Sequence, residues 1–183
     1  MFDLNNINWF KININKLLIY HYMNKKKLTI EFTEYISLQD GLDMNLVGLL
    51  KKAEKNLINS YSPYSQFKVS AALTLSNGEV VLGTNQENAA YPSGICAERV
   101  AIFSAKSTFP KEDVVEIAIV TQQSNPFPFS PCGACRQVLM EYEMLQKKPI
   151  KVILKSGNSK IWVYNSIKDL LPFGFDAADI LKK

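Results

Sequence analysis

Apolar residues recur along the chain with two different periods. Between Asp43 and Asn59 they return every three or four positions, which predicts one amphipathic helix. Phe67–Leu75 has the composition of a buried strand, and Val80–Asn85 that of a second strand. The Asn77-Gly78 pair between them predicts a type I′ turn, so the two strands are expected to form a hairpin.

The remainder of the chain alternates between the two periods. Strands are predicted over Val114–Thr121, Ile150–Lys155 and Lys160–Tyr164, helices over Cys96–Ser107 and Cys132–Tyr142, and two short helices after the last strand. Helices that alternate with strands after an opening hairpin imply the α/β class, with a mixed sheet covered on both faces.

The first forty residues have a different composition. Residues 1–40 are rich in Asn, Lys and Ile, and Asn disfavours both helix and strand, so this segment is expected to be a weakly ordered extension. Residues 41–183 are expected to form a single catalytic domain. The one histidine, His21, lies in the extension and is interpreted as non-catalytic.

Bulk composition narrows the classes of function. The chain has 183 residues and a net charge of +4, and its lysines are scattered singly or in pairs, which argues against a nucleic-acid partner. No run approaches the roughly 18 apolar residues that a membrane helix requires, so no membrane partner is expected. An odd number of cysteines, three, argues against a disulfide framework and favours a reducing, cytoplasmic setting.

All three cysteines lie in two short motifs, Cys96-Ala97-Glu98-Arg99 and Pro131-Cys132-Gly133-Ala134-Cys135-Arg136-Gln137. The Cys132/Cys135 spacing alone is equally typical of a zinc site and of a redox pair. Each motif falls at a predicted helix start, where the helix dipole favours thiolates, and a redox pair would not need Cys96. Three thiolate ligands leave a fourth position on zinc for water, which is the catalytic arrangement. The sequence therefore predicts a catalytic Zn²⁺ site.

Three charged residues next to the cysteines are candidates for the chemistry. Glu98 can act as the base and acid that moves protons around a zinc-activated water; its alternative role is a helix-start glutamate that complements the dipole. Arg99 and Arg136 can offset the thiolate charge by hydrogen bonding to sulfur. For Arg136 a surface or interface salt bridge is an equal alternative.

These motifs resemble those of the zinc-dependent nucleoside deaminases, and closely those of the small, homotetrameric cytidine deaminase family. The resemblance covers residues 44–176 and extends to three further stretches, Tyr61–Val69, Asn85–Tyr91 and Leu170–Pro172. It implies a three-layer α/β/α sandwich around a mixed five-stranded sheet. It also implies one Zn²⁺ per subunit and the hydrolytic deamination of cytidine and 2′-deoxycytidine in pyrimidine salvage.

The resemblance also implies how the nucleoside is bound. Asn85 and Glu87 match the pair that binds the ribose hydroxyl, and alternation along a strand end places both on one face. An amide and a carboxylate suit a hydroxyl that both donates and accepts. The negative charge of Glu87 would repel a phosphate, so a free nucleoside is the expected substrate.

Further positions follow from the same resemblance. Phe67 matches the aromatic residue that packs on the pyrimidine, although an ordinary core position is an equal alternative. The Ala97 backbone is expected near the exocyclic amine, and Tyr91 near a site shared between subunits. Phe175 matches an aromatic residue that reaches in from a neighbouring subunit. One departure is Ser70, which stands where the family usually has Gly.

Three other functions share parts of these motifs. A deaminase of aminonucleoside antibiotics is disfavoured by the Asn85 and Glu87 pair. A polynucleotide editor is disfavoured because the chain lacks a basic and aromatic stripe. A non-catalytic zinc or thiol module would release no ammonia from any pyrimidine nucleoside.

Overall fold

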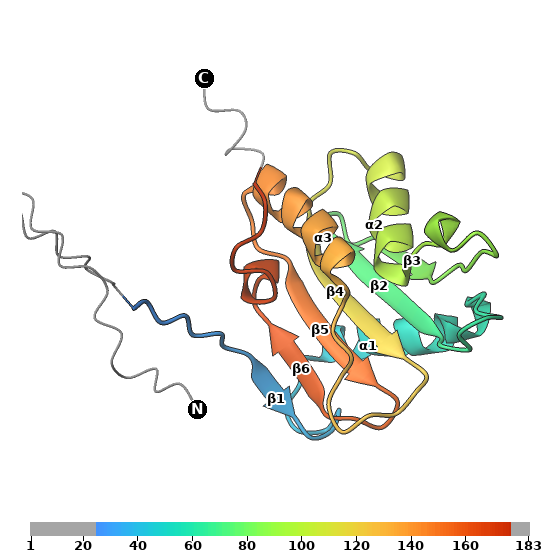
Figure 1. The fold of residues 1–183 in the computed structure, drawn as a ribbon. Coiled ribbons are helices and arrows are strands. Elements are labelled where there is room, and N and C mark those ends of the chain that lie inside the picture. The colour runs from blue at the N-terminus through green and yellow to red at the C-terminus, as the bar shows by residue number, and fades with distance from the viewer. Residues whose placement is uncertain (1–24, 177–183) are drawn as a thin grey trace, which may run out of the picture.

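The structure is a computed structural model that describes residues 25–176 and folds them into one mixed sheet between two layers of helix (Figure 1). The strand order is β1-β6-β5-β4-β2-β3, and β4 and β5 form the one parallel pair of this sheet. In chain order the elements are β1 (Thr33–Tyr35), α1 (Met44–Asn56), β2 (Val69–Leu75), β3 (Val80–Thr84), α2 (Ala97–Thr108), β4 (Val114–Thr121), α3 (Gly133–Gln146), β5 (Lys151–Ser156) and β6 (Ile161–Tyr164), with 3₁₀ turns at Leu57–Asn59, Tyr91–Ser93 and Ile167–Asp169.

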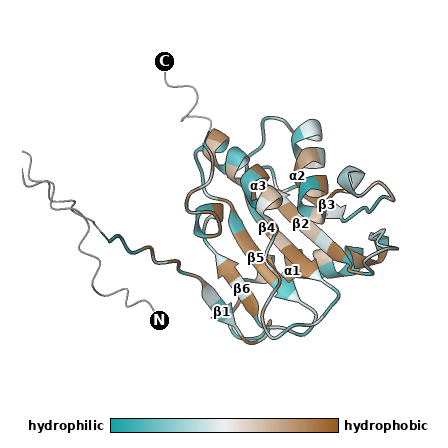
Figure 2. Cartoon of the chain, in the orientation of Figure 1, coloured by the Kyte–Doolittle hydropathy of each residue, from teal (hydrophilic) through white to brown (hydrophobic). Residues whose placement is uncertain are grey.

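The two faces of the sheet are covered by different helices, which confirms the expected three layers. Alternate residues of β4 point to opposite faces. Ile117 and Ile119 pack in the core under α2 and α3, whereas Ala118 and Val120 pack in the core under α1. The strands are therefore apolar on both sides, and they form the brown centre of the molecule in Figure 2.

The sheet has six strands, so the expectation of five is wrong by one. The additional strand is β1, which lies inside the segment 1–40 and pairs with β6 through Thr33 opposite Val163. Its order comes from contacts that are distant in sequence: the Phe32 ring lies 4.7 Å from that of Trp162, and Glu34 accepts a hydrogen bond from the Trp162 indole (2.9 Å). Residues 1–24, which include His21, lie outside the described residues.

The β2–β3 turn also differs from its prediction. A type I′ turn needs positive φ at both central residues. Gly78 has φ +85°, but Asn77 is not among the positive-φ residues. The hairpin instead closes through Leu75 N to Glu79 O (2.9 Å), with Gly78 N bonded to Leu75 O, so the loop has three residues and a left-handed glycine at its end. The Asn77 side chain accepts from Glu79 N and stabilises this longer loop.

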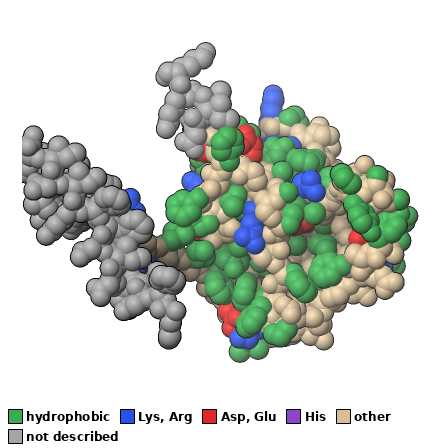
Figure 3. All heavy atoms as spheres, in the orientation of Figure 1, with side chains coloured by type: hydrophobic (Ala, Val, Ile, Leu, Met, Phe, Trp, Pro, Cys, Tyr) green, Lys and Arg blue, Asp and Glu red, His purple; other side chains and the backbone are tan. Residues whose placement is uncertain are grey.

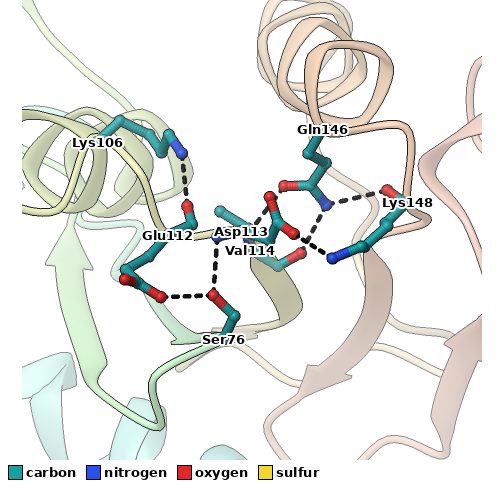
Figure 4. Close-up of polar contacts among 7 residues, drawn as sticks. All are labelled: Ser76, Lys106, Glu112, Asp113, Val114, Gln146 and Lys148. Atoms are coloured by element: carbon teal, nitrogen blue, oxygen red, sulfur yellow. Dashed lines mark hydrogen bonds and ion pairs between the residues drawn. The ribbon is translucent and has the colours of Figure 1, made fainter.

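A polar network ties the helix layer to the start of β4 (Figure 4). Gln146, the last residue of α3, accepts from Val114 N (2.9 Å) and donates to Val114 O (2.8 Å), so its amide acts as a short strand partner. Ser76 exchanges hydrogen bonds with the backbone of Asp113, whose carboxylate pairs with Lys148. These contacts hold the connection between α2 and β4.

Within residues 25–176, no helix combines the length and the apolar composition that a membrane crossing needs.

Candidate metal centre and active site

The three cysteines converge at the ends of two helices. Cys96 is the N-cap of α2, Cys132 is the N-cap of α3, and Cys135 lies in the first turn of α3. Their sulfur atoms all lie within 4.8 Å of one another, and those of Cys96 and Cys132 are 3.9 Å apart. The topology thus places the two helix N-termini side by side, and with them the positive ends of two helix dipoles.

This spacing fits zinc and does not fit a disulfide. Zinc–sulfur bonds of about 2.3 Å in a tetrahedron place sulfurs about 3.8 Å apart, whereas a disulfide requires about 2.05 Å. The Cys96 sulfur lies in the same cluster as those of Cys132 and Cys135, and a redox pair would not need this third sulfur. Of the two interpretations that the Cys-x-x-Cys motif permits, the geometry favours the metal site.

The thiols differ in their tendency to ionise. Hydrogen bonding with Cys135, and then with the Arg99 guanidinium, lowers the pKa of Cys96 to about 5 despite partial burial. The same contact with Cys96, together with burial, raises the pKa of Cys135. Arg99 donates from Nη2 to the Cys96 sulfur (3.7 Å), which places a fixed positive charge beside the thiolate. Cys96 is therefore the more readily ionised of these two thiols, and thiolates are ligands that zinc prefers.

Glu98 is buried beside the sulfurs. Its carboxyl is 4% exposed, and desolvation raises its pKa, with a smaller contribution from the negative charge of Cys96. Hydrogen bonding with Cys135 opposes this rise and places the carboxyl next to that sulfur. A buried carboxyl whose pKa lies above the usual range can hold a proton and release it, as a general acid and base must.

Arg136 makes different contacts from those expected. Its three nitrogens donate to oxygen atoms, namely Pro131 O (2.7 Å), Leu170 O (3.0 Å) and Ser130 Oγ (2.9 Å). It therefore fixes the backbone that precedes Cys132 and ties that backbone to the C-terminal segment. None of these three hydrogen bonds is to a sulfur atom.

Ala97 and Gly83 show how closely α2 packs on the sheet. Ala97 is fully buried, and a Cβ added to Gly83 of β3 would lie 2.4 Å from Ala97 O and 2.5 Å from Ala101 N. Only a glycine permits this approach. The sequence pattern had not singled out Gly83, although an isolated Gly inside a strand is a signal of close backbone contact.

Asn85 follows β3 and is anchored to β2 and to the loop before it. Its amide oxygen accepts from Val69 N (2.9 Å) and Ser60 Oγ (2.5 Å), and its amide nitrogen donates to Phe67 O (2.8 Å). One amide N–H is still available beyond these contacts.

The Glu87 carboxylate is held by the same loop. One oxygen accepts from the backbone nitrogens of Tyr64 (2.9 Å) and Ser65 (3.2 Å), and the other accepts from the Ser65 hydroxyl. The hydroxyl contact is the main cause that lowers the pKa of Glu87, so this group is negative at neutral pH. Three of about four lone-pair positions are used, which leaves one acceptor site.

Aromatic side chains surround these groups. Phe67 meets Phe129 edge to face, with ring centroids 5.1 Å apart at 83°. Phe129 lies in a proline-rich loop without periodicity, so its sequence context gives no sign of this contact. Tyr91 is 73% exposed and touches Tyr64 edge-on.

Phe175 is held at the surface by its backbone. Its ring is 62% exposed, while Gln137 donates to Phe175 O (2.7 Å) and accepts from Phe175 N (3.1 Å). The motif that contains Gln137 gives no sign of this contact in the sequence. The role of Gln137 depends on where the C-terminal segment crosses α3.

The chain is similar to known proteins in sequence and in fold. Residues 45–148 match the family model described as the cytidine and deoxycytidylate deaminase zinc-binding region. The cytidine deaminase of Halalkalibacterium halodurans is 42% identical over 132 residues, which are 72% of this chain and 95% of the relative. That of Sporosarcina psychrophila is 40% identical over 137 residues, which are 75% of this chain and 96% of the relative.

Solved structures agree with these relatives. The crystal structure of cytidine deaminase from Burkholderia pseudomallei is 40% identical, with a TM-score of 0.63, and covers 70% of this chain and 98% of its own. The crystal structure of cytidine deaminase from Mycobacterium leprae is 30% identical, with a TM-score of 0.56, and the match covers 71% of this chain and 99% of the other. The chain therefore belongs to the cytidine and deoxycytidylate deaminase family of zinc-binding enzymes. Cys96, Cys132 and Cys135 are the residues that would hold the metal.

Proposed function

We propose that this enzyme hydrolyses cytidine and 2′-deoxycytidine to uridine and 2′-deoxyuridine, with release of ammonia, and that it serves pyrimidine salvage. The observation that supports the proposal most strongly is the buried Glu98 carboxyl beside a cluster of three thiols at two helix N-termini. Two of the relatives described above carry the name cytidine deaminase.

Glu98 is proposed to move the protons of the reaction. When zinc is bound, it lowers the pKa of a coordinated water from 15.7 to about 7. Glu98 takes one proton from the attacking water and delivers it to N3 of the pyrimidine while the water oxygen bonds to C4. It then transfers the second proton of that water to the amino group. The C4–N bond breaks, ammonia leaves, and C4 keeps the oxygen as a carbonyl.

The sugar is proposed to be recognised by the hydrogen-bonding capacity that remains at Asn85 and Glu87. Asn85 has one amide N–H left to donate, and Glu87 has one lone-pair position left to accept. A ribose hydroxyl accepts from the first and donates to the second. Because Glu87 is negative, a 5′-phosphate nearby would be repelled, so the substrate is a nucleoside.

The base is proposed to lie between Phe67 and the first turn of α2. The Phe67 ring supplies an apolar wall, and the buried Ala97 backbone faces the exocyclic amine. We further propose a homotetramer in which Phe175 enters a neighbouring site and Tyr91 lies near it. Both rings are exposed on the protomer, which leaves them free to contact a neighbour. A cytoplasmic location suits the free thiols.

Glu98→Gln tests the proposal against a matched control. The variant should retain one zinc per chain and lose turnover, because the amide cannot carry the proton. Glu79→Gln, an exposed carboxylate on the β2–β3 turn, should behave as the parent. Zinc content is measured together with the loss of ultraviolet absorbance on cytidine, deoxycytidine, CMP and adenosine. Full activity in Glu98→Gln, or no ammonia from any pyrimidine nucleoside with the parent protein, contradicts the proposal.

A further inference from the structure

Aromatic residues connect the N-terminal strand to the body of the domain. The Phe32 ring, directly before β1, lies 4.7 Å from the Trp162 ring and 5.3 Å from the Tyr164 ring, centroid to centroid. The Phe127 ring also contacts Trp162, with a centroid distance of 5.6 Å and an angle of 35° between the ring planes. Figure 3 shows hydrophobic side chains gathered at this β1–β6 end of the sheet. We call Phe32, Trp162 and Phe127 the aromatic brace.

Phe127 belongs to the loop that leads to the metal ligands. This loop, residues 122–131, connects β4 to Cys132 at the start of α3. Two residues after Phe127, the Phe129 ring meets Phe67 edge to face at 5.1 Å, and Phe129 N donates to Ser156 Oγ (2.8 Å). The same short loop therefore contacts the brace at one position and the proposed base-binding ring at another.

The brace is fixed at its outer end by polar contacts. Glu34 of β1 accepts from the Trp162 indole nitrogen (2.9 Å) and pairs with Lys160, which directly precedes β6. The backbone register pairs Glu34 with Trp162 and places Thr33 opposite Val163. The pairing of β1 with β6 and the indole hydrogen bond together orient the Trp162 ring between Phe32 and Phe127.

We infer that the N-terminal strand positions the base-binding site: Phe32 holds Trp162, Trp162 holds Phe127, and the loop thus fixed sets the place of Phe129 against Phe67. This inference rests on the proposed function for the identity of the substrate. Phe32 and Phe127 are positioning residues, since neither is among the groups proposed to touch the nucleoside. Loss of Phe32 is expected to loosen the loop and weaken cytidine binding while Glu98 and the thiols remain in place.

Phe32→Ala removes the first ring of the brace. The KM for cytidine should rise about threefold to tenfold, the range expected for the loss of one aromatic pair. The kcat should stay within about a factor of two and zinc content should not change, because the proton-transfer group is untouched. Phe32→Tyr keeps the aromatic ring and should have the same KM as the parent. Ile36→Ala, which removes an isoleucine that is 76% exposed in the same segment, is the matched control and should have no effect.

Two readouts do not depend on activity. In a Trp9→Phe background, Trp162 is the one remaining tryptophan, so its fluorescence emission reports changes in the contacts of its ring with Phe32 and Phe127. Backbone hydrogen exchange should accelerate within residues 122–131 in Phe32→Ala, including at Phe129 N, and not in Ile36→Ala. If the parent enzyme fails to deaminate any pyrimidine nucleoside, the proposed function is wrong, yet exchange and emission still decide whether the brace holds the loop.

A double-mutant cycle separates positioning from simple stabilisation. If Phe32 and Phe127 act through one path, the double alanine variant should raise KM no further than either single variant does. If the double variant raised KM by the product of the two single-variant factors, the inference would be wrong. It would also be overturned if Phe32→Ala lowered only the melting temperature and left loop exchange and KM unchanged.

Discussion

Replacing Glu143 by alanine should destabilise the protein, because it removes the acceptor of three hydrogen bonds inside the core. One carboxylate oxygen accepts from Ile150 N (2.7 Å) and Ile167 N (3.0 Å), and the other accepts from the Ser166 hydroxyl (2.6 Å). Both isoleucines are fully buried, so their N–H groups cannot turn to water. Each orphaned donor costs about 1–3 kcal/mol, so the two together should lower the free energy of unfolding by about 2–6 kcal/mol.

Glu143→Gln is the matched control. The glutamine amide oxygen can occupy the position that serves both backbone N–H groups, and its nitrogen can donate to the Ser166 hydroxyl, which rotates to accept. The two buried donors stay satisfied, and only the strengthening that the negative charge supplies is lost. The expected cost is about 1 kcal/mol.

The measurement is urea unfolding of the zinc-loaded protein, followed by circular dichroism. Protein and zinc concentrations are kept equal across variants, because binding and association both add apparent stability. The reasoning is refuted if Glu143→Ala loses less than about 0.5 kcal/mol, as an ordinary surface substitution would. It is equally refuted if the glutamine variant is as unstable as the alanine variant.

Three further substitutions test other parts of the structure. Gly83→Ala should lower the free energy of unfolding in urea by about 1–3 kcal/mol and should also lower zinc content, because the added Cβ would lie 2.4 Å from Ala97 O. Gly48→Ala, whose Cβ would meet open space, is the control and should not destabilise the protein. The hydrogen bond from Lys160 is the main cause that lowers the pKa of Glu34, so the parent should be more stable than Glu34→Gln, fully so above the ordinary pKa of 4.5. This difference in stability should disappear as the pH falls through the lowered pKa. Thermal unfolding across acidic pH measures the difference, and a difference that grew with acidity would contradict a stabilising Glu34–Lys160 contact. Arg136→Lys keeps the charge but cannot make all three contacts, so zinc affinity measured by chelator competition should fall about 10- to 100-fold, and unchanged affinity would show that the loop needs no such support.

Some features of this structure could be predicted from the sequence, and others could not. The sulfur cluster was predictable, because Cys96 and the Cys132/Cys135 pair each lie at a helix start that periodicity reveals. The β1 strand was not, since three residues in an Asn-rich and Lys-rich segment have no periodicity of their own. Its order depends on Trp162, which is far away in sequence.

Local turn chemistry was predicted only in part. Asn77-Gly78 correctly marked a hairpin, but the number of loop residues followed from which strand residues pair. In the structure Thr74 pairs with Val80 and Leu75 N bonds to Glu79 O, so three residues, 76–78, lie in the loop. The register is set by packing of the two strands on both helix layers, which no dipeptide encodes.

By itself the amino-acid sequence determined the class of fold, because the apolar periods reveal the order of helices and strands. It also determined which residues are candidates for the site, because the three cysteines and Glu98 are recognisable from their residue types and from their positions at helix starts. Only the tertiary structure decided that Arg136 supports a loop, that Gln137 holds the Phe175 backbone and that Phe129 lies against Phe67. These contacts join segments distant in the chain. Their partners are fixed by how the helices and strands pack, and packing is a property of the whole domain.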